Sequence, residues 1–186
     1  MPEALFDPMR HRRQGPDYAG PMFVNIRIRQ ATAEDASTIA AILSHAAKWV
    51  EQLDGTTMWV DNELAEGRIA SEVKAGLFHV AECDGEMTGV LKFQLDDQLF
   101  WPDLATSDSA FIHRLAVRRD YAGRGVATAL LGSAVDHARL LGKRYLRLDC
   151  DAERARLRDV YERFGFRFHS FRQVGSYYVA RYELDL

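Results

Sequence analysis

The sequence predicts an α/β protein in which helices cover both faces of a mixed, mostly antiparallel central sheet. Two observations carry this prediction. Strand-like and helix-like patterns follow one another in the order β-α-α-β-β-β-α-β-α-β-β, with antiparallel hairpins first and a β-α-β unit second. The chain has 186 residues, 47% of them hydrophobic, and no internal repeat, which suits one domain with a sizeable core.

Composition and charge narrow the function and the compartment. The chain carries 24 basic and 27 acidic residues, a net charge of −3, so it has no basic excess to neutralise a nucleic-acid backbone. No apolar run has the length of a membrane-spanning helix, and the N-terminus lacks the apolar core of a signal peptide. The two cysteines, Cys83 and Cys150, are far apart in the sequence and are expected to be reduced and buried. We therefore expect a cytoplasmic protein that binds neither nucleic acid nor membrane.

Residues 1–22 differ in composition from the rest of the chain. They contain four prolines, a basic cluster at positions 10–13 and no sustained periodicity. We interpret them as a tail or arm that precedes a single domain at residues 23–186.

The first strand and helix are predicted by periodicity and by a cap. Val24–Gln30 alternates Val and Ile with Asn and Arg, which is typical of a strand with one buried face. Thr32 and Asp35 then form a variant of the capping box, in which Asp replaces Glu or Gln. The apolar residues that follow at helical spacing, from Ile39 to Val50, define the helix.

A second helix and a hairpin come next. The helix, at about 61–74, is a weaker prediction because Gly67 lies in its middle. Asp84-Gly85 between two apolar runs is one of the strongest short signals for a β-hairpin, with strands at 77–83 and 87–95. The stretch 96–108 is long and without periodicity, which is typical of functional or mobile loops.

The centre of the chain is a strand, a glycine-rich turn and a long helix. Ser109–Val117 alternates as a strand, and apolar residues recur at helical spacing from Ala127 to Leu141. Gly123-Arg124-Gly125 lies between them, where the first amides of a helix have no internal partner and the helix dipole is positive. Because glycines let a ligand approach the backbone, this turn is a candidate site for a phosphate or pyrophosphate. The alternative is an ordinary tight connection.

Four elements complete the chain. A short buried strand is predicted at 145–150, and a helix from Leu157 to Phe164 ends at Gly165. Two strands follow at 166–172 and 177–184.

These motifs together resemble the GNAT superfamily of acetyl-CoA-dependent N-acetyltransferases. The resemblance covers about residues 26–184 and lies in the element order and in three motifs. They are Arg-Leu-Ala-Val at the end of the central strand, Gly123-Arg124-Gly125-Val126-Ala127, and Tyr161-Glu162-Arg163-Phe164-Gly165-Phe166. The resemblance implies the GNAT fold, in which the central strand splays from its parallel neighbour and opens a V-shaped slot. It also implies direct transfer of an acetyl group from acetyl-CoA to a primary amine through a tetrahedral intermediate.

The resemblance further implies which residues hold acetyl-CoA. Backbone groups of Leu115, Ala116 and Val117 are expected to pair with the pantetheine arm, and a β-bulge there would aim an amide at the thioester oxygen. The pyrophosphate is expected on the amides of the glycine turn, by which we mean residues 122–128. Its members are Ala122, Gly123, Arg124, Gly125, Val126, Ala127 and Thr128.

Two positions depart from the family pattern. The turn pattern is Gln/Arg-x-x-Gly-x-Gly/Ala, and its first position here is Ala122, so Arg119 and Arg124 are candidates to supply the missing charge. The family often has Asn seven residues before the tyrosine of the last helix. That position here is Arg154, a candidate cationic contact to the cofactor.

Acetyl transfer requires a neutral amine, a donor to the developing oxyanion and a proton for the departing thiolate. Tyr161 is the candidate general acid, since a phenol with a pKa of about 10 stays protonated at neutral pH. His113 is the candidate base, and its position resembles the His-x-Leu-Ala-Val of arylalkylamine acetyltransferases. Strand alternation predicts that it shares a face with Leu115. For Tyr161 the alternative role is packing, and for His113 it is a structural hydrogen bond. Glu82 and Asp149 are fallback bases.

Metal and hydrolase chemistry are not predicted. The six histidines are scattered, without the paired-His or Cys-His spacing of zinc sites. A Gly-x-Ser-x-Gly elbow is absent from the sequence, which argues against a serine hydrolase.

Aromatic residues are candidates for binding the acceptor. The main candidates are Trp59, Trp101 and Tyr177, with Trp49 and Phe100 in the same regions. Core or loop packing is the alternative for each. The aspartates of 96–108 favour a cationic amine. The last hairpin is a candidate for extending the sheet of a homodimer.

Three hypotheses follow from these observations. The first is acetyl transfer to the amine of a small molecule. The second is acetyl transfer to a protein N-terminus or lysine, which needs an open groove. The third is a non-catalytic CoA-binding module, which the departures at Ala122 and Arg154 would favour.

Overall fold

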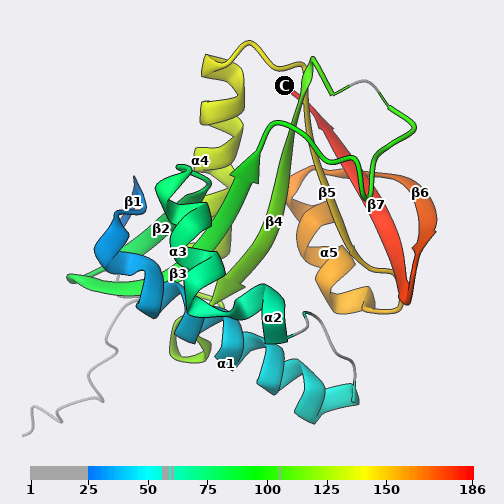
Figure 1. Ribbon diagram of the computed structural model, residues 1–186. Helices are drawn as coiled ribbons and strands as arrows, with labels where there is room; N and C mark the ends of the chain where they lie inside the picture. Colours follow the sequence, from blue (N-terminus) through cyan, green and yellow to red (C-terminus); the bar gives the residue numbers. More distant parts are fainter. Residues whose placement is uncertain (1–24, 56–58, 60, 105) are drawn as a thin grey trace, which may run out of the picture.

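The computed structural model describes residues 25–55, 59, 61–104 and 106–186. These residues form a seven-stranded sheet of order β1-β2-β3-β4-β5-β7-β6, in which β4 and β5 are the parallel pair and all other neighbours are antiparallel (Figure 1). The strands are β1 (Ile26–Gln30), β2 (Phe78–Cys83), β3 (Glu86–Gln94), β4 (Ser109–Val117), β5 (Tyr145–Asp151), β6 (Arg167–Val174) and β7 (Tyr177–Asp185). The helices are α1 (Ala36–Asp54), α2 (Asp61–Leu64), α3 (Glu66–Lys74), α4 (Val126–Leu140) and α5 (Ala155–Phe164).

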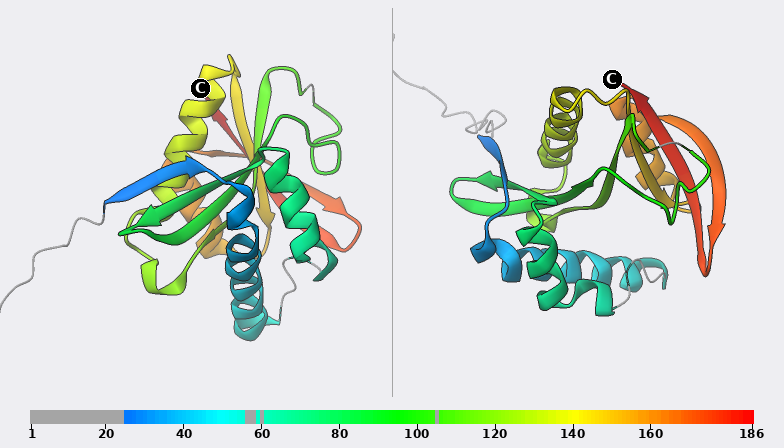
Figure 2. Two further views of the ribbon diagram at one scale, coloured as in Figure 1. Left: turned by 60° about the vertical axis from the view of Figure 1, so that its left-hand side comes forward. Right: turned by 45° about the horizontal axis from the view of Figure 1, so that its top comes forward.

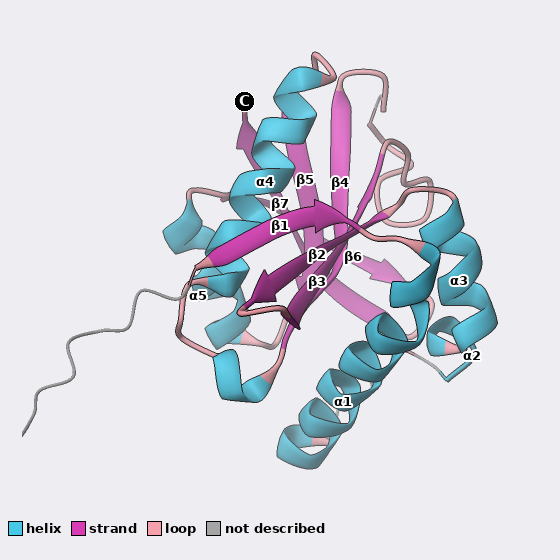
Figure 3. Ribbon diagram, turned by 90° about the vertical axis from the view of Figure 1, so that its left-hand side faces the viewer, coloured by secondary structure: helices cyan, strands magenta, loops and turns pink. Residues whose placement is uncertain are grey.

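Helices cover both faces of the sheet, as predicted (Figures 2 and 3). On one face, α4 contributes Leu130 and Leu131 and α5 contributes Tyr161 to a buried apolar cluster. On the other face, Ile39 of α1 and Ile69 of α3 belong to a second cluster. Both clusters take apolar residues from the strands between them, so the sheet is the middle layer of three.

Several local predictions are confirmed. Asp84 and Gly85 have φ of 52° and 83°, the conformation of the two-residue hairpin turn between β2 and β3. The amide of Thr32 donates to the Asp35 carboxylate at 2.7 Å, as in a capping box. The central strand β4 has the predicted bounds, Ser109–Val117. The first strand begins at Ile26, and Val24 lies outside the described residues.

The predicted helix at 61–74 is divided, and this part of the prediction is wrong. The helices α2 and α3 are separated at Ala65, whose ψ of 132° is extended, whereas Gly67 lies inside α3. Leu64 and Ile69 are five residues apart, which one continuous helix would place on different faces. The break at Ala65 allows both to be buried in the cluster against α1.

A β-bulge in β4 changes which residues face the helices. The β3–β4 register pairs Val90 with Ala116 but Lys92 with His113, so β4 holds one extra residue. At the bulge, Arg114 has a backbone φ of 50°, in the left-handed region. Ile112 packs on the α4 side before the bulge and Leu115 does so after it. His113 therefore does not share a face with Leu115, which corrects the prediction from strand alternation.

The parallel strands β4 and β5 separate partway along their length. They pair from Ser109 with Tyr145 to Ile112 with Leu148, and no further pair follows. The next residues, His113 and Asp149, are the first beyond the last pair. We call this point the fork, and it is the splay that the family resemblance implied.

The structure bears on the predictions for the cysteines and for membrane-spanning helices, but not on the predicted tail. Cys83 and Cys150 are free and buried, as expected. No helix in the described ranges combines the length and apolar character needed to cross a membrane. The proposed tail, residues 1–22, lies outside the described residues.

Candidate functional site

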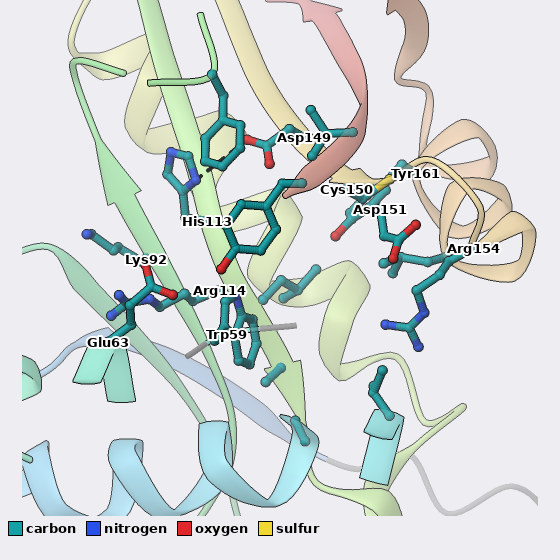
Figure 4. Close-up of a pocket in the computed structure, with 18 of the residues that line it drawn as sticks. Trp59, Glu63, Lys92, His113, Arg114, Asp149, Cys150, Asp151, Arg154 and Tyr161 are labelled. Atoms are coloured by element: carbon teal, nitrogen blue, oxygen red, sulfur yellow. Dashed lines mark ion pairs between the residues drawn. The ribbon is translucent and has the colours of Figure 1, made fainter. Parts of the chain in front are cut away.

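A cavity of about 1010 Å³ opens at the fork (Figure 4). Its wall is built from β3, β4, β5, β6 and β7, from α1, α2, α3 and α5, and from the loop after β3. The splay leaves backbone and side chains of two central strands facing this space instead of each other. A volume of this size accommodates a ligand with part of a cofactor.

Three titratable side chains, which we call the apex cluster, meet where the strands separate. They are Asp97, His113 and Asp149. His113 Nε2 is 3.4 Å from Asp97 Oδ2, and His113 Nδ1 is 3.7 Å from Asp149 Oδ1. The Asp97 carboxylate is fixed by the amides of Leu99 and Phe100, at 3.2 and 3.0 Å. Asp97 Oδ2, His113 Nε2 and Asp149 Oδ1 are nevertheless buried without a hydrogen-bond partner in the described structure.

Burial shifts the protonation of the apex cluster toward its neutral forms. It lowers the pKa of His113 to about 3, and the positive charges of Lys92 and Arg114 act in the same direction. It raises the pKa of Asp149 to about 8, assisted by the charge of Asp97 and opposed by Arg181. The pKa of Asp97 is also raised by burial. At neutral pH burial therefore favours the neutral imidazole of His113 and the neutral carboxyl of Asp149.

Beside the apex cluster, basic side chains converge on one carboxylate. We call Arg68, Lys92 and Arg114 the cation cluster. Glu72 accepts from Lys92 Nζ at 2.9 Å and from Arg114 Nη1 at 2.6 Å, and Arg68 Nε lies 3.7 Å from it. All three cations line the cavity, whereas Glu72 does not. Glu63 lies next to Lys92 and Arg114 (Figure 4).

Tyr161 and Arg154 approach the cavity from the α5 side. Tyr161 is buried, lines the cavity and lies close to Cys150 and Asp149 (Figure 4). Burial raises the pKa of its phenol above the ordinary value, with the charges of Cys150 and Asp149 in the same direction. Arg154 precedes the first turn of α5 and also lines the cavity.

The residues implied in cofactor binding fall into two groups. Leu115, Ala116 and Val117 line the cavity beyond the bulge. The glycine turn lies outside the cavity wall, next to its rim at Arg118–Asp120. The turn has the predicted backbone, because Gly123 and Gly125 have φ of 75° and 86° and Val126 begins α4.

The amides at the start of α4 are available to a ligand. In the described structure, the N–H groups of Gly123, Gly125 and Val126 donate to no backbone carbonyl. Gly123 and Gly125 are exposed, and a Cβ at Gly123 would meet no atom within 4 Å. This is the geometry of a helix N-terminus that binds an anion. Of the candidates for the missing charge at Ala122, Arg119 lies 3.7 Å above the Trp49 ring and Arg124 lies 5.3 Å from the Tyr121 ring.

Some of the residues predicted to bind the acceptor line the cavity, and one does not. Trp59 and Tyr177 line the cavity, and so do Trp49 and Phe100. Trp101 is fully buried under Arg181 and against Phe111, and it does not reach the cavity. The prediction that Trp101 binds the acceptor is therefore wrong. The reason is that the irregular segment folds inward at this residue, so the Trp101 ring joins the core while the neighbouring Phe100 faces the cavity.

Two further expectations are changed by the side-chain contacts. Glu82, a fallback base, is paired with Arg29 at 2.7 Å and lies outside the cavity wall, whereas Asp149 lines it. The acidic loop does not form an acidic mouth, because Asp103 is paired with Arg181 at 2.6 Å and with Arg172 at 3.2 Å. Of the aspartates in that loop, Asp97 is the one that lines the cavity.

Sequence reasoning missed the cation cluster and the role of Asp97 in the apex cluster. Lys92 stands within the apolar run Val90-Leu91-Lys92-Phe93, and a charge inside a central strand was the available signal. No local signal was available for Asp97, because 16 residues separate it from His113 and only the fold brings them together.

Comparisons with known proteins agree with the fold and the motifs. The sequence model of the acetyltransferase (GNAT) family matches residues 45–166. An uncharacterized N-acetyltransferase of Bacillus subtilis (strain 168), YesJ, is 30% identical over 146 residues, which are 74% of this chain and 79% of that protein.

Solved structures are similar over nearly the whole fold. A GNAT-family acetyltransferase from Listeria monocytogenes has a TM-score of 0.71 at 22% identity, covering 87% of this chain and 95% of its own. The PaiA N-acetyltransferase from Thermoplasma acidophilum, in complex with coenzyme A, has a TM-score of 0.68 at 17% identity, covering 84% of this chain and 97% of its own. At these identities the likeness shows the fold alone.

Proposed function

The chain belongs to the acetyltransferase (GNAT) family and is an acyltransferase, and from this premise we propose that it acetylates a primary amine of a small molecule with acetyl-CoA. The observation that carries the proposal is the fork. One cavity there joins the backbone of Leu115–Val117, the phenol of Tyr161 and the imidazole of His113. These are the groups that bind a thioester arm, protonate a thiolate and accept a proton from an amine.

The proposed binding site for acetyl-CoA consists of the two groups of cofactor residues described above. Leu115, Ala116 and Val117 pair with the pantetheine arm along the exposed side of the fork. The amides of the glycine turn bind the pyrophosphate, and Arg154 contributes positive charge from the opposite side. The Thermoplasma protein, which shares the fold, was solved in complex with coenzyme A, and this supports coenzyme A as the ligand.

In the proposed mechanism, acetyl-CoA supplies an acetyl thioester and the chain supplies positions and protons. His113 accepts a proton from the amine, and the Asp97 carboxylate beside it stabilises the imidazolium that forms. Tyr161 donates its proton to the departing thiolate, because burial raises the pKa of the phenol and keeps it protonated at neutral pH. An N–H of the bulge at Arg114 is the candidate donor to the oxyanion.

A small acceptor is favoured over a protein chain. The groups proposed to receive the amine are buried, since the side chain of Asp97 is 3% exposed and that of His113 is 17% exposed. A lysine side chain can reach such a depth, but a folded protein N-terminus needs an open groove around it.

The test is release of free thiol when the purified protein is mixed with acetyl-CoA and a panel of primary amines. We expect thiol release that depends on the amine, with N-acetylated product detected by mass spectrometry. A protein that binds coenzyme A but acetylates none of the small amines, while acetylating peptides or nothing, would contradict the proposal.

A further inference from the structure

We propose that the acceptor carries an acid group a few bonds from its amine, as an amino acid does. This inference rests on the proposed acetyl transfer and adds the class of substrate. It depends on two adjoining parts of the cavity, the cation cluster and the apex cluster. The first is suited to an acid group and the second to an amine.

The cation cluster places two poorly exposed cations on one shared carboxylate. Lys92 and Arg114 both pair with Glu72, and Glu63 lies beside them. The third cation, Arg68, also reaches Glu72, but its side chain is 51% exposed to solvent. The side chains of Lys92 and Arg114 are only 13% and 7% exposed, so water compensates them poorly.

The donors of the cation cluster are also incompletely used. Lys92 Nζ has three N–H donors and gives one to Glu72 at 2.9 Å. Both Lys92 and Arg114 line the cavity in front of Glu72. A carboxylate or similar acid group placed there would pair with these two cations and accept the hydrogen bonds that Lys92 does not give to Glu72.

The apex cluster has a different character, because it holds carboxyl oxygens and an imidazole nitrogen that are buried without partners and carries no fixed positive charge. Asp97 Oδ2, His113 Nε2 and Asp149 Oδ1 are buried without a partner. One ligand atom from each residue lies within 4.8 Å of the others. A nitrogen that donates hydrogen bonds of about 2.9 Å can reach acceptors up to about 4.7 Å apart, so one amine nitrogen placed here can contact the atoms of this cluster.

The two clusters are close enough for one small molecule to contact both. Lys92 and His113 are direct partners across β3 and β4. Side chains at such positions leave the sheet about 5 Å apart. The positive charges of Lys92 and Arg114 also lower the pKa of His113, and the charge of Lys92 acts to lower the pKa of Asp97. A molecule whose amine lies in the apex cluster would therefore place its acid group against Lys92, provided that only a few bonds separate the amine from the acid group.

The experiment compares acceptors in matched triplets with the wild-type protein. Each triplet consists of an amino acid, its carboxamide and the amine without the carboxyl carbon, all with the same side chain. We expect kcat/KM for the best amino acid to exceed that for its two analogues by at least about a hundredfold, because a buried charged site is left unpaired by either analogue.

A charge variant assigns the preference to the cation cluster. Lys92→Met keeps most of the stem and removes the ammonium, and it should reduce the ratio of amino acid to carboxamide at least about tenfold. Lys74→Met, on the exposed last turn of α3, is the matched control and should leave the ratio unchanged.

The outcomes separate this inference from the function on which it rests. Equal rates for the three members of every triplet, or a preference for the amine without the acid, would overturn the acid-group inference and leave acetyl transfer intact. Acetyl-CoA binding without acetylation of any acceptor would contradict both the acid-group inference and the proposed acetyl transfer. A preference for the acid that survives in Lys92→Met would also count against the inference.

Discussion

Replacing His113 by asparagine is expected to lower the turnover of acetyl transfer by about 100- to 1000-fold while the affinity for coenzyme A changes little. Positioned general bases contribute rate factors of this size. His113 is at the fork, between Asp97 and Asp149. Turnover would be measured by thiol release and affinity by calorimetry.

The same experiment has a pH readout. Because burial lowers the pKa of His113 to about 3, the imidazole is neutral above that value. Protonation of His113 should therefore produce no acid limb in the rate between pH 5 and pH 8. Asp149, whose pKa burial raises to about 8, titrates near the upper end of this window with every acceptor. A fall in rate toward low pH that shifts when the amine is changed belongs to the acceptor amine, and one that does not shift belongs to Asp149.

His79→Asn is the matched control for His113→Asn. His79 is also a strand histidine, and burial lowers its pKa to about 4. Its ring packs against Phe93 and His137, outside the cavity wall. Full turnover in His113→Asn, or an equal loss in both variants, would remove His113 from the mechanism.

Replacing Tyr161 by phenylalanine is expected to lower turnover about 100-fold, with little change in the affinity for coenzyme A. The substitution removes one oxygen and keeps the ring contacts with Phe166 and Tyr182, so the fold should be retained. The loss arises because the departing thiolate no longer receives a proton from a positioned phenol. Since burial raises the pKa of Tyr161, the wild-type rate should show no alkaline limb from this phenol below about pH 10.

Tyr182→Phe provides the control for this variant. The Tyr182 hydroxyl donates to Glu162 at 2.6 Å and accepts from Arg158 at 2.9 Å, and Tyr182 does not line the cavity. Its loss should cost about 1 kcal/mol of unfolding free energy and leave turnover near wild type. A Tyr161→Phe protein with normal turnover would assign Tyr161 to packing alone.

Local signals predicted most of the fold. The Asp84-Gly85 turn, the Thr32–Asp35 cap and the bounds of β4 depend on residues that are neighbours in the chain, and each is confirmed. The division of the helix at Ala65 was missed because no breaker marks that position, and the burial of Leu64 and Ile69 decides it.

The site was predicted less completely because it depends on features with no local signature. The bulge at Arg114 puts a non-glycine residue at φ 50°, and strand alternation without it assigns His113 to the wrong face. Trp101 is indistinguishable in sequence from a pocket aromatic, since only the path of its loop makes it core. The apex cluster joins residues 97, 113 and 149, which meet only after three elements have folded.

The central claim is that the free amides of the glycine turn bind the diphosphate of coenzyme A. Amide NMR spectra recorded during titration with coenzyme A test it, with pantetheine as the ligand that lacks the diphosphate. We expect the signals of Gly123, Gly125 and Val126 to shift with coenzyme A only, and those of Leu115–Val117 to shift with both ligands.

A matched pair of glycine variants sharpens this measurement. Gly123 and Gly142 have φ of 75° and 67°, and a Cβ would meet no atom within 4 Å at either position, so Gly→Ala strains the backbone alike. Gly123→Ala should weaken coenzyme A binding at least about tenfold and Gly142→Ala should not. Turn amides that stay unshifted while coenzyme A binds, or no binding at all, would contradict the account.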